Sequence, residues 1–240
     1  MSILSGKYLS ERNMIKQMLN GATVAFCVAM SATSLSAAQS APHSPLEVSL
    51  EQQRQAILED PMAPRVQPKG YDVTIIEYMD YQCPYCRASH GPLKQLLAAD
   101  RKVRVIFRDW PIFGPASERA ARLSIASQWQ GKHSAFHDAL MTTPQPLSEA
   151  KIKAAAKSSR VDWSRLVIDL KRHASDIEAL LKRNADQAEQ LGLEGTPGFI
   201  IGNVQSFGGM TLAQFKDAVR VARRDRSSRP LSVPQQPPGL

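Results

Sequence analysis

The sequence predicts an α/β domain in which a strand–helix–strand unit is followed by a helical block, a hairpin and a final helix. Two β-rich apolar runs, Val73–Tyr78 and Val103–Arg108, enclose a helical pattern at 87–99. Residues 116–191 show helical periodicity almost throughout. The turn pair Gly202-Asn203 then separates the short segments Phe199–Ile201 and Gln205–Phe207, which is typical of a hairpin. Strand–helix–strand at this spacing is typical of a right-handed parallel unit.

Composition and charge exclude several classes of protein. Of the 240 residues, 43% are hydrophobic and 22% are charged, which is typical of a globular protein and not of a disordered or membrane-embedded one. The formal net charge is +8, yet no dense Lys/Arg stripe interleaved with aromatic residues precedes the C-terminal helix. We therefore expect no nucleic-acid binding. The length permits one domain with tails.

The first 38 residues have the pattern of a secretory signal peptide. A basic start (Lys7, Arg12 and Lys16) precedes a short apolar core at 21–30 and a run of small residues around Ala38. The apolar core has about ten residues, too few to span a bilayer. We expect export, with cleavage near Ala38.

Residues 39–70 predict a helix and a linker ahead of the main domain. The segment Leu46–Glu59 is weakly amphipathic, and the proline-containing stretch Pro61–Gly70 follows it. The apolar positions repeat too rarely for a coiled coil. This favours a helix that packs on the domain over an oligomerisation stalk, and leaves open a monomer or a small homo-oligomer.

The remaining elements complete a recognisable order. Ser148 and Asp162 are placed to cap helices within 116–191, the hairpin follows, and Thr211 caps a last helix, Leu212–Arg224. The order β-α-β, helices, β-β-α is that of the thioredoxin fold with a helical insertion domain. We expect this domain to occupy 71–224, with its insertion at about 116–191, and the proline-rich residues 225–240 to be disordered.

Cys83 and Cys86 stand where the first strand ends and its helix begins. Unpaired N–H groups and the positive end of the dipole at a helix start stabilise an anion, so a thiol there has a lowered pKa. Cys83 is the candidate nucleophile at an accessible helix mouth, and the less exposed Cys86 is the candidate resolving thiol. Pro84 suits the first helical position because its missing N–H would lack a partner there.

Other interpretations of two close cysteines are weaker. A c-type haem site needs His directly after the second Cys, where this chain has Arg87. A structural zinc site needs four ligands, and the third cysteine, Cys27, lies in the segment that we expect to be removed. A purely structural disulfide would close a loop too short to restrain the unfolded chain much. The spacing predicts a thioredoxin-like redox site that requires no metal and no cofactor.

Three motifs together resemble one family. These are Glu77–Arg87 (EYMDYQCPYCR), Phe107–Ile112 (FRDWPI) and Gly195–Gly202 (GTPGFIIG). In this order they resemble the DsbA family of extracytoplasmic thiol:disulfide oxidoreductases, and most closely its Com1/ScsC/BdbD-like branch. The resemblance covers about residues 57–224.

The resemblance implies roles for further residues. Pro197 would be cis and lie against the cysteine pair, with the backbone of Thr196 docking substrate as an added strand. Glu77 would be a buried acid that relays protons at Cys86, although the strand pattern alone allows a solvent-facing Glu equally well. Tyr85 stands where DsbA has His, so we expect a less oxidising pair.

For the other side chains near the two cysteines, we predict only whether they are exposed or buried. His90 shares a helix face with both cysteines, and we expect an exposed surface histidine. Arg87 is expected to cap solvated surface. The group Tyr78, Met79, Tyr81, Trp110 and Phe113 has the apolar character of a substrate-binding rim, but we expect most of these residues in the core. Of the aromatic residues near the motif, only Tyr81 and Tyr85 are expected to be exposed.

These observations predict a periplasmic thiol:disulfide oxidoreductase that forms or rearranges disulfides in other exported proteins. Its partners would be unfolded or misoxidised proteins with cysteines and a membrane redox partner, DsbB-like for an oxidase or DsbD-like for an isomerase. Two alternatives remain open. One is an oligomeric isomerase or reductase kept reduced. The other is an ScsC-like protein of copper tolerance, in which two thiolates hold Cu(I).

Overall fold

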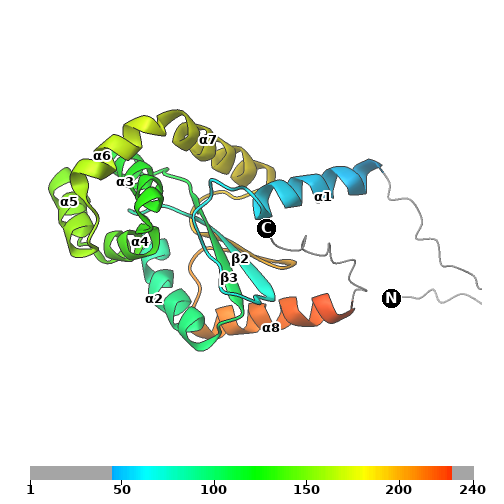
Figure 1. The fold of residues 1–240 in the computed structure, drawn as a ribbon. Coiled ribbons are helices and arrows are strands. Elements are labelled where there is room, and N and C mark those ends of the chain that lie inside the picture. The colour runs from blue at the N-terminus through cyan, green and yellow to red at the C-terminus, as the bar shows by residue number, and fades with distance from the viewer. Residues whose placement is uncertain (1–44, 229–240) are drawn as a thin grey trace, which may run out of the picture. The chain divides into compact units, whose positions relative to one another are not determined.

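The computed structural model describes residues 45–228, which contain one mixed five-stranded sheet with helices around it (Figure 1). The strand order is β1-β3-β2-β4-β5; β2 and β3 are parallel, and the other neighbours are antiparallel. The strands are β1 (Arg65–Val66), β2 (Val73–Met79), β3 (Val103–Asp109), β4 (Gly198–Ile201) and β5 (Val204–Phe207). The predicted thioredoxin fold is confirmed. The predicted signal peptide, 1–38, lies outside the described residues.

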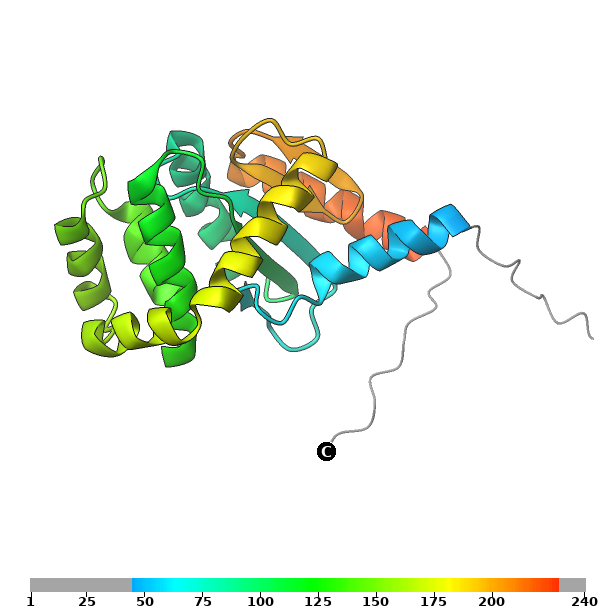
Figure 2. The ribbon, with the colours of Figure 1, turned by 90° about the horizontal axis from the view of Figure 1, so that it is seen from above.

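A helical block is inserted between β3 and β4, as the sequence predicts (Figure 2). It consists of α3 (Pro115–Ala126), a 3-10 turn (Ser127–Gln130), α4 (His133–Thr142), α5 (Glu149–Ser158), α6 (Trp163–Arg172) and α7 (Ala174–Gln190). The other helices are α1 (Pro45–Leu58), α2 (Pro84–Ala99) and α8 (Leu212–Ser228). The last helix therefore continues four residues past its expected end at 224. The expected helix at 46–59 is α1.

The segment expected to be only a linker contains an edge strand. Arg65 and Val66 of β1 pair antiparallel with Ile106 and Val105 of β3. A strand of two residues among prolines has no periodicity that a sequence could display. It covers the outer edge of β3, which would otherwise present unpaired backbone groups.

Both faces of the central strands are buried. Ile75 in β2, Val105 in β3 and Phe199 in β4 pack with α2 and α8 on one face, whereas Ile76 and Ile200 pack with α7 on the other. This explains why β2 and β3 show no strict alternation of apolar and polar residues in the sequence.

A buried arginine joins α1, β3 and α7 on the α7 face. Arg108 is fully buried, lies 3.0 Å from a carboxylate oxygen of Asp60 and donates to the Asn184 side-chain oxygen at 3.1 Å. It also donates to the carbonyl of Ile57. A buried charge needs such partners. The end of α1 is therefore attached to the domain, in line with the packed-helix interpretation of this segment.

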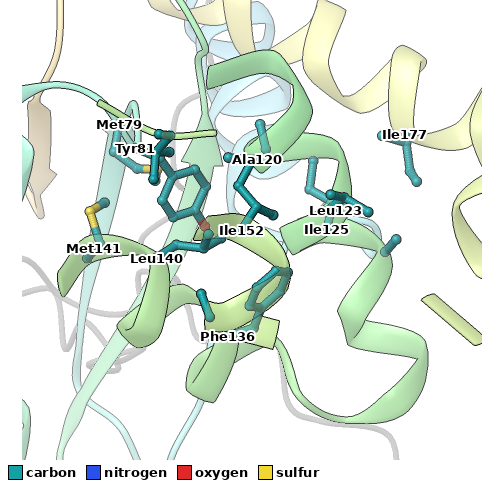
Figure 3. Packing of buried hydrophobic residues seen from close by; sticks show 14 of the residues in the cluster. Met79, Tyr81, Ala120, Leu123, Ile125, Phe136, Leu140, Met141, Ile152 and Ile177 are labelled. Carbon is teal, nitrogen blue, oxygen red and sulfur yellow. The ribbon is translucent and has the colours of Figure 1, made fainter. Parts of the chain in front are cut away.

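Tyr81 lies inside the core of the helical block, where Figure 3 shows it among Met79, Leu140 and Ile152. Only 1% of its surface is exposed, so the expected exposed Tyr81 is wrong. Its hydroxyl donates to Ser124 at 2.6 Å, the kind of partner that a buried phenol requires.

Of the possible apolar rim, Tyr78, Met79 and Tyr81 are all buried, and Phe113 is exposed. The core expectation is confirmed for Tyr78 and Met79, whereas the exposure of Phe113, which the sequence did not predict, is a second correction besides Tyr81.

His90 is also buried, contrary to expectation. Its ring lies against His137 of α4, with centroids 5.2 Å apart, and its Nε2 lies 3.2 Å from a carboxylate oxygen of Asp138. His133 completes this group, and Phe107 of β3 packs against both α4 histidines. Sequence spacing placed His90 on the correct helix face but could not reveal that α4 covers this face.

The buried histidines predict an acid-sensitive fold. Burial lowers the pKa of His133 to about 3, so the unfolded chain binds this proton more tightly than the native state does. Stability from this group is therefore complete above pH 6.5 and is lost as the pH falls toward 3. Between pH 7 and pH 4, the free energy of unfolding, measured in urea, should fall by roughly 3 kcal/mol less in His133→Leu than in the wild type. Equal losses in both proteins would contradict this account.

Candidate active site

Cys83 is the N-cap residue of α2. Its backbone is extended (φ −68°, ψ 120°), its sulfur accepts from the backbone N–H of Cys86 at 3.4 Å, and Pro84 occupies the first turn. A polar atom on the N-cap side chain satisfies one of the free N–H groups at a helix start. The predicted position of Cys83 at the start of the helix is confirmed.

The surroundings of Cys83 lower its pKa to about 6. The largest cause of the lowered pKa is a hydrogen bond from the Cys86 thiol. Burial acts in the opposite direction and raises the pKa. Hydrogen bonds from the Thr196 side chain and from the backbone N–H groups of Cys86 and Tyr85 lower it further. The Thr196 hydroxyl is buried with no other partner in the described part of the chain. At neutral pH Cys83 is therefore largely a thiolate.

Cys86 has the opposite character. It is completely buried, and burial raises its pKa far above the ordinary value, with the neighbouring Cys83 adding to the effect. Both cysteines are reduced in this structure. One sulfur is thus ionised and the other holds its proton, which is the asymmetry that a nucleophile and a resolving thiol require.

The Thr196–Pro197 peptide bond is cis and lies beside Cys83, 113 residues away in sequence. As a thiol, Cys83 donates to the Thr196 carbonyl, with the sulfur and oxygen 3.1 Å apart. Sheet register explains the contact, because Gly198 at the start of β4 pairs with Tyr78 near the end of β2. The two motifs therefore meet at one end of the sheet.

Access to Cys83 differs from expectation. Only 1% of the residue surface is exposed, whereas the following Tyr85 is 66% exposed. Tyr85 is the exposed aromatic that the sequence predicts, but the expected open Cys83 is wrong. The contact with Thr196 contributes to this cover. A substrate sulfur can reach Cys83 only if neighbouring groups move aside.

Glu77 lies in β2, and 1% of its surface is exposed. One of its carboxyl oxygens, Oε2, has no hydrogen-bond partner among the described residues. Burial raises its pKa to about 8, and the charges of Asp109 and Cys83 add to the effect. Of the two orientations left open by the strand pattern, the structure has the buried one, so Glu77 can hold a proton at neutral pH.

Sequence reasoning missed Asp80, which fixes the turn that carries Cys83. Its buried carboxylate accepts from the backbone N–H groups of Gln82, Ile112 and Phe113 and from the Ser117 hydroxyl, at 2.6–3.0 Å. A short acid that bonds a backbone N–H two residues on is typical of a turn. The sequence could therefore have indicated that Asp80 forms a turn. It could not have indicated that Asp80 also binds the segment between β3 and α3.

Gln82 and Arg87 fasten the same region to the helical block. The Gln82 side chain donates to the Phe113 carbonyl at 3.1 Å and accepts from the backbone N–H of Leu147 at 3.1 Å. Arg87 donates to the carbonyls of Leu140 and Thr143, at 3.0 and 2.5 Å. The expectation that Arg87 caps solvated surface is wrong: it satisfies carbonyls at the end of α4. Within 45–228, no group of three or more His, Cys, Asp or Glu residues could hold a metal ion.

The site combines an ionised thiol at a helix start, a neighbouring cis-proline and a second, buried thiol. This arrangement is typical of thiol:disulfide oxidoreductases of thioredoxin fold, and the protein belongs to this class. More narrowly, the chain belongs to the DsbA family. Residues 74–220, well over half of its length, match the family described as the DSBA-like thioredoxin domain.

Solved structures with similar folds agree with this membership. A thioredoxin-like oxidoreductase from Silicibacter pomeroyi is 36% identical, with a TM-score of 0.68, over 71% of this chain and 98% of that one. The thiol-disulfide exchange protein alpha-DsbA2 from Wolbachia pipientis is 28% identical (TM-score 0.67; 72% and 94% covered). The catalytic domain of Proteus mirabilis ScsC is 25% identical (TM-score 0.66; 74% and 98% covered).

Curated relatives carry a different name. The Na(+)/H(+) antiporter NhaA 3 of Salinispora tropica is 27% identical over 68% of this chain, but this chain spans only about 25% of that protein. In the described part of this chain, no helix has the length and apolar character needed to cross a membrane. The antiporter name describes the whole of those longer proteins.

Proposed function

We propose that this protein exchanges disulfides with cysteine-containing exported proteins through the Cys83–Cys86 pair. The observation that carries the proposal is the asymmetry of the two thiols beside Thr196–Pro197: Cys83 is ionised near neutral pH, and Cys86 is buried and protonated. A low-pKa thiol is both a nucleophile and a good leaving group.

In the reducing direction, the Cys83 thiolate attacks one sulfur of a substrate disulfide. A bond forms between Cys83 and that sulfur, and the other substrate sulfur leaves as a thiolate. Cys86 then loses its proton and attacks Cys83, so that the Cys83–Cys86 disulfide forms and the second substrate thiolate leaves. In the oxidising direction the same bonds form and break in reverse. Glu77 is the proposed acceptor and donor of the Cys86 proton.

Substrate docking is proposed beside the cis-proline. The Thr196 backbone lies 3.1 Å from the reacting sulfur, so an extended segment paired with it would bring its cysteine to Cys83. Pro84 and the exposed Tyr85, which follow Cys83 at the start of α2, are proposed to contact the same segment. Docking there requires the Thr196 segment to move away from Cys83, because this segment lies against the buried sulfur.

The balance between oxidase and isomerase depends on how strongly the thiolate is stabilised. Tyr85 offers a neutral phenol where an imidazolium would stabilise the thiolate further, which favours a less oxidising pair. We propose a periplasmic location, supported by the secretory pattern of residues 1–38, and recycling by a DsbB-like or DsbD-like membrane partner. A reduction potential measured against glutathione would distinguish an oxidase from a protein that is kept reduced.

Two assays with a common control test the activity. The reduced protein should accelerate insulin reduction, and a redox-buffered sample should reactivate a scrambled disulfide protein. A Cys83→Ala/Cys86→Ala variant should be inactive in both assays. Wild-type activity no higher than that of this variant would contradict the proposal, and tight Cu(I) binding in its place would favour the copper-tolerance alternative.

A further inference from the structure

A second buried acid lies near Glu77 and has no role in the proposed exchange so far. Asp109 is the last residue of β3, and 1% of its surface is exposed. Neither of its carboxyl oxygens has a hydrogen-bond partner among the described residues. An ionised carboxylate without partners is very costly to bury, so this group is kept neutral over much of the pH range.

Sheet register places the two acids close together. In the parallel β2–β3 pair, Glu77 is opposite Phe107 and Met79 is opposite Asp109. Side chains alternate along a strand and partners share a face, so all four project to the same side of the sheet. Phe107 packs there with α2 residues Leu93 and Leu96, which identifies this as the side that α2 covers.

The groups around the two acids have mainly acidic or neutral character. From the β2–α2 turn, the charge of Asp80 raises the pKa of Asp109, after burial as the main cause, to about 8. The charge of Asp109 in turn raises the pKa values of Glu77 and Tyr81. From α2, the Cys83 thiolate adds negative charge, and the buried Cys86 thiol is neutral.

The nearest basic groups do not neutralise the pair. From α4, burial keeps the pKa of His137 well below its ordinary value, so this ring is neutral. From α7, Asn184 donates only to the Asp109 backbone carbonyl. Arg108 projects to the opposite face, where it pairs with Asp60.

We propose that Glu77 and Asp109 act as one coupled carboxyl pair beneath the two cysteines, in which Asp109 sets the pH at which Glu77 exchanges a proton with Cys86. Asp109 acts through Glu77 and is a positioning residue, not a catalytic one. The inference rests on the proposed exchange activity and adds to it a residue that controls its pH dependence. Two close acids that share a site titrate as a pair, with one proton held much more tightly than the other.

The step concerned is resolution of the mixed disulfide. The proton of the Cys86 thiol passes to the Glu77 carboxylate, the Cys86 sulfur bonds to Cys83, and the bond from Cys83 to the substrate sulfur breaks. The substrate leaves as a thiolate, so no further oxidant or reductant is needed. Near pH 8, where both acids titrate, the negative charge that forms on Asp109 makes Glu77 hold its own proton to higher pH. Removing that charge should therefore allow Glu77 to accept the Cys86 proton at lower pH.

Acid-quenched reactions of the reduced protein with glutathione disulfide test this. Mass spectrometry of the quenched samples gives the lifetime of the mixed disulfide as a function of pH. The resolution rate should fall at low pH, where Glu77 keeps its proton, and we call this fall the acid limb. In Asp109→Asn, the acid limb should lie about one pH unit lower, the size expected for coupled sites. Glu77→Gln should remove that limb, and adding Asp109→Asn to Glu77→Gln should change nothing more. Asp217→Asn, on the exposed side of α8, is the matched control and should leave the profile unchanged.

The outcomes separate the two proposals. An unshifted limb in Asp109→Asn, or a shift that persists without Glu77, would overturn the coupled pair and leave the exchange activity intact. A wild type that forms no mixed disulfide would overturn both. Asp109→Leu, which also lacks the charge, should give the same shift as Asp109→Asn. If only one of the two variants shifts the limb, the effect is structural and the proposal is wrong.

Discussion

Replacing Cys86 with alanine is expected to stop turnover and to leave Cys83 in a persistent mixed disulfide with substrate. The attacking group for resolution is then missing, and a well-placed intramolecular group acts as if present at about 10⁵ M or more. We expect turnover to fall by at least roughly a thousandfold, even with external thiol present. The pKa of Cys83 should also rise from about 6, because the Cys86 thiol is the largest cause of its lowering.

Trapping followed by non-reducing electrophoresis measures the first effect. The Cys86→Ala protein should accumulate complexes with cysteine-containing substrates, and Cys83→Ala, its matched control, should accumulate none. If the complexes formed on Cys86 instead, the assignment of nucleophile and resolving thiol would have to be exchanged. Normal turnover in Cys86→Ala would contradict the two-thiol account altogether.

Asp80→Ala is expected to be the most destabilising polar substitution near the site. Its carboxylate is the acceptor for three backbone N–H groups and one hydroxyl, and 1% of the residue surface is exposed. Alanine would leave these buried donors without a partner, at a cost of about 1–3 kcal/mol for each one that water cannot reach. We expect a total loss of at least about 3 kcal/mol.

Urea unfolding at neutral pH tests this prediction. Asp80→Asn retains one acceptor oxygen and should fall between the wild type and Asp80→Ala, and Asp217→Ala on exposed α8 should change stability little. A loss below about 1 kcal/mol in Asp80→Ala would mean that the turn does not depend on this carboxylate. It would then be unclear what holds Cys83 at the helix start.

The sequence allowed the order of elements along the chain, the helical insertion and the cysteine pair to be predicted, since each depends on local pattern. Apolar periodicity locates β2, β3 and the helices, and Pro84 marks the start of α2. The prediction that Thr196–Pro197 lies beside the cysteines came from the family resemblance, because no local sequence pattern indicates a contact between segments so far apart. The cis bond and the 3.1 Å contact confirm this placement.

Apart from the end of the last helix, the failures concern contacts between distant segments. Tyr81 and His90 have the polar tips of surface residues, but the inserted helices cover them and supply Ser124 and Asp138 as partners. Cys83 loses its exposure in the turn that meets the start of β4. Burial of a polar side chain depends on what the chain brings over it, and local sequence does not contain that information.

The ionisation of Cys83 in the reduced protein is the most direct test of the whole account. Thiolate absorbance in the ultraviolet, followed against pH with the Cys83→Ala protein as the blank, gives the midpoint without any substrate. The account predicts a midpoint near pH 6, from the hydrogen bonds of Cys86 and the start of α2. A midpoint near 9.0, the ordinary value for a thiol, would show that the helix start does not stabilise this sulfur and would contradict the proposed exchange.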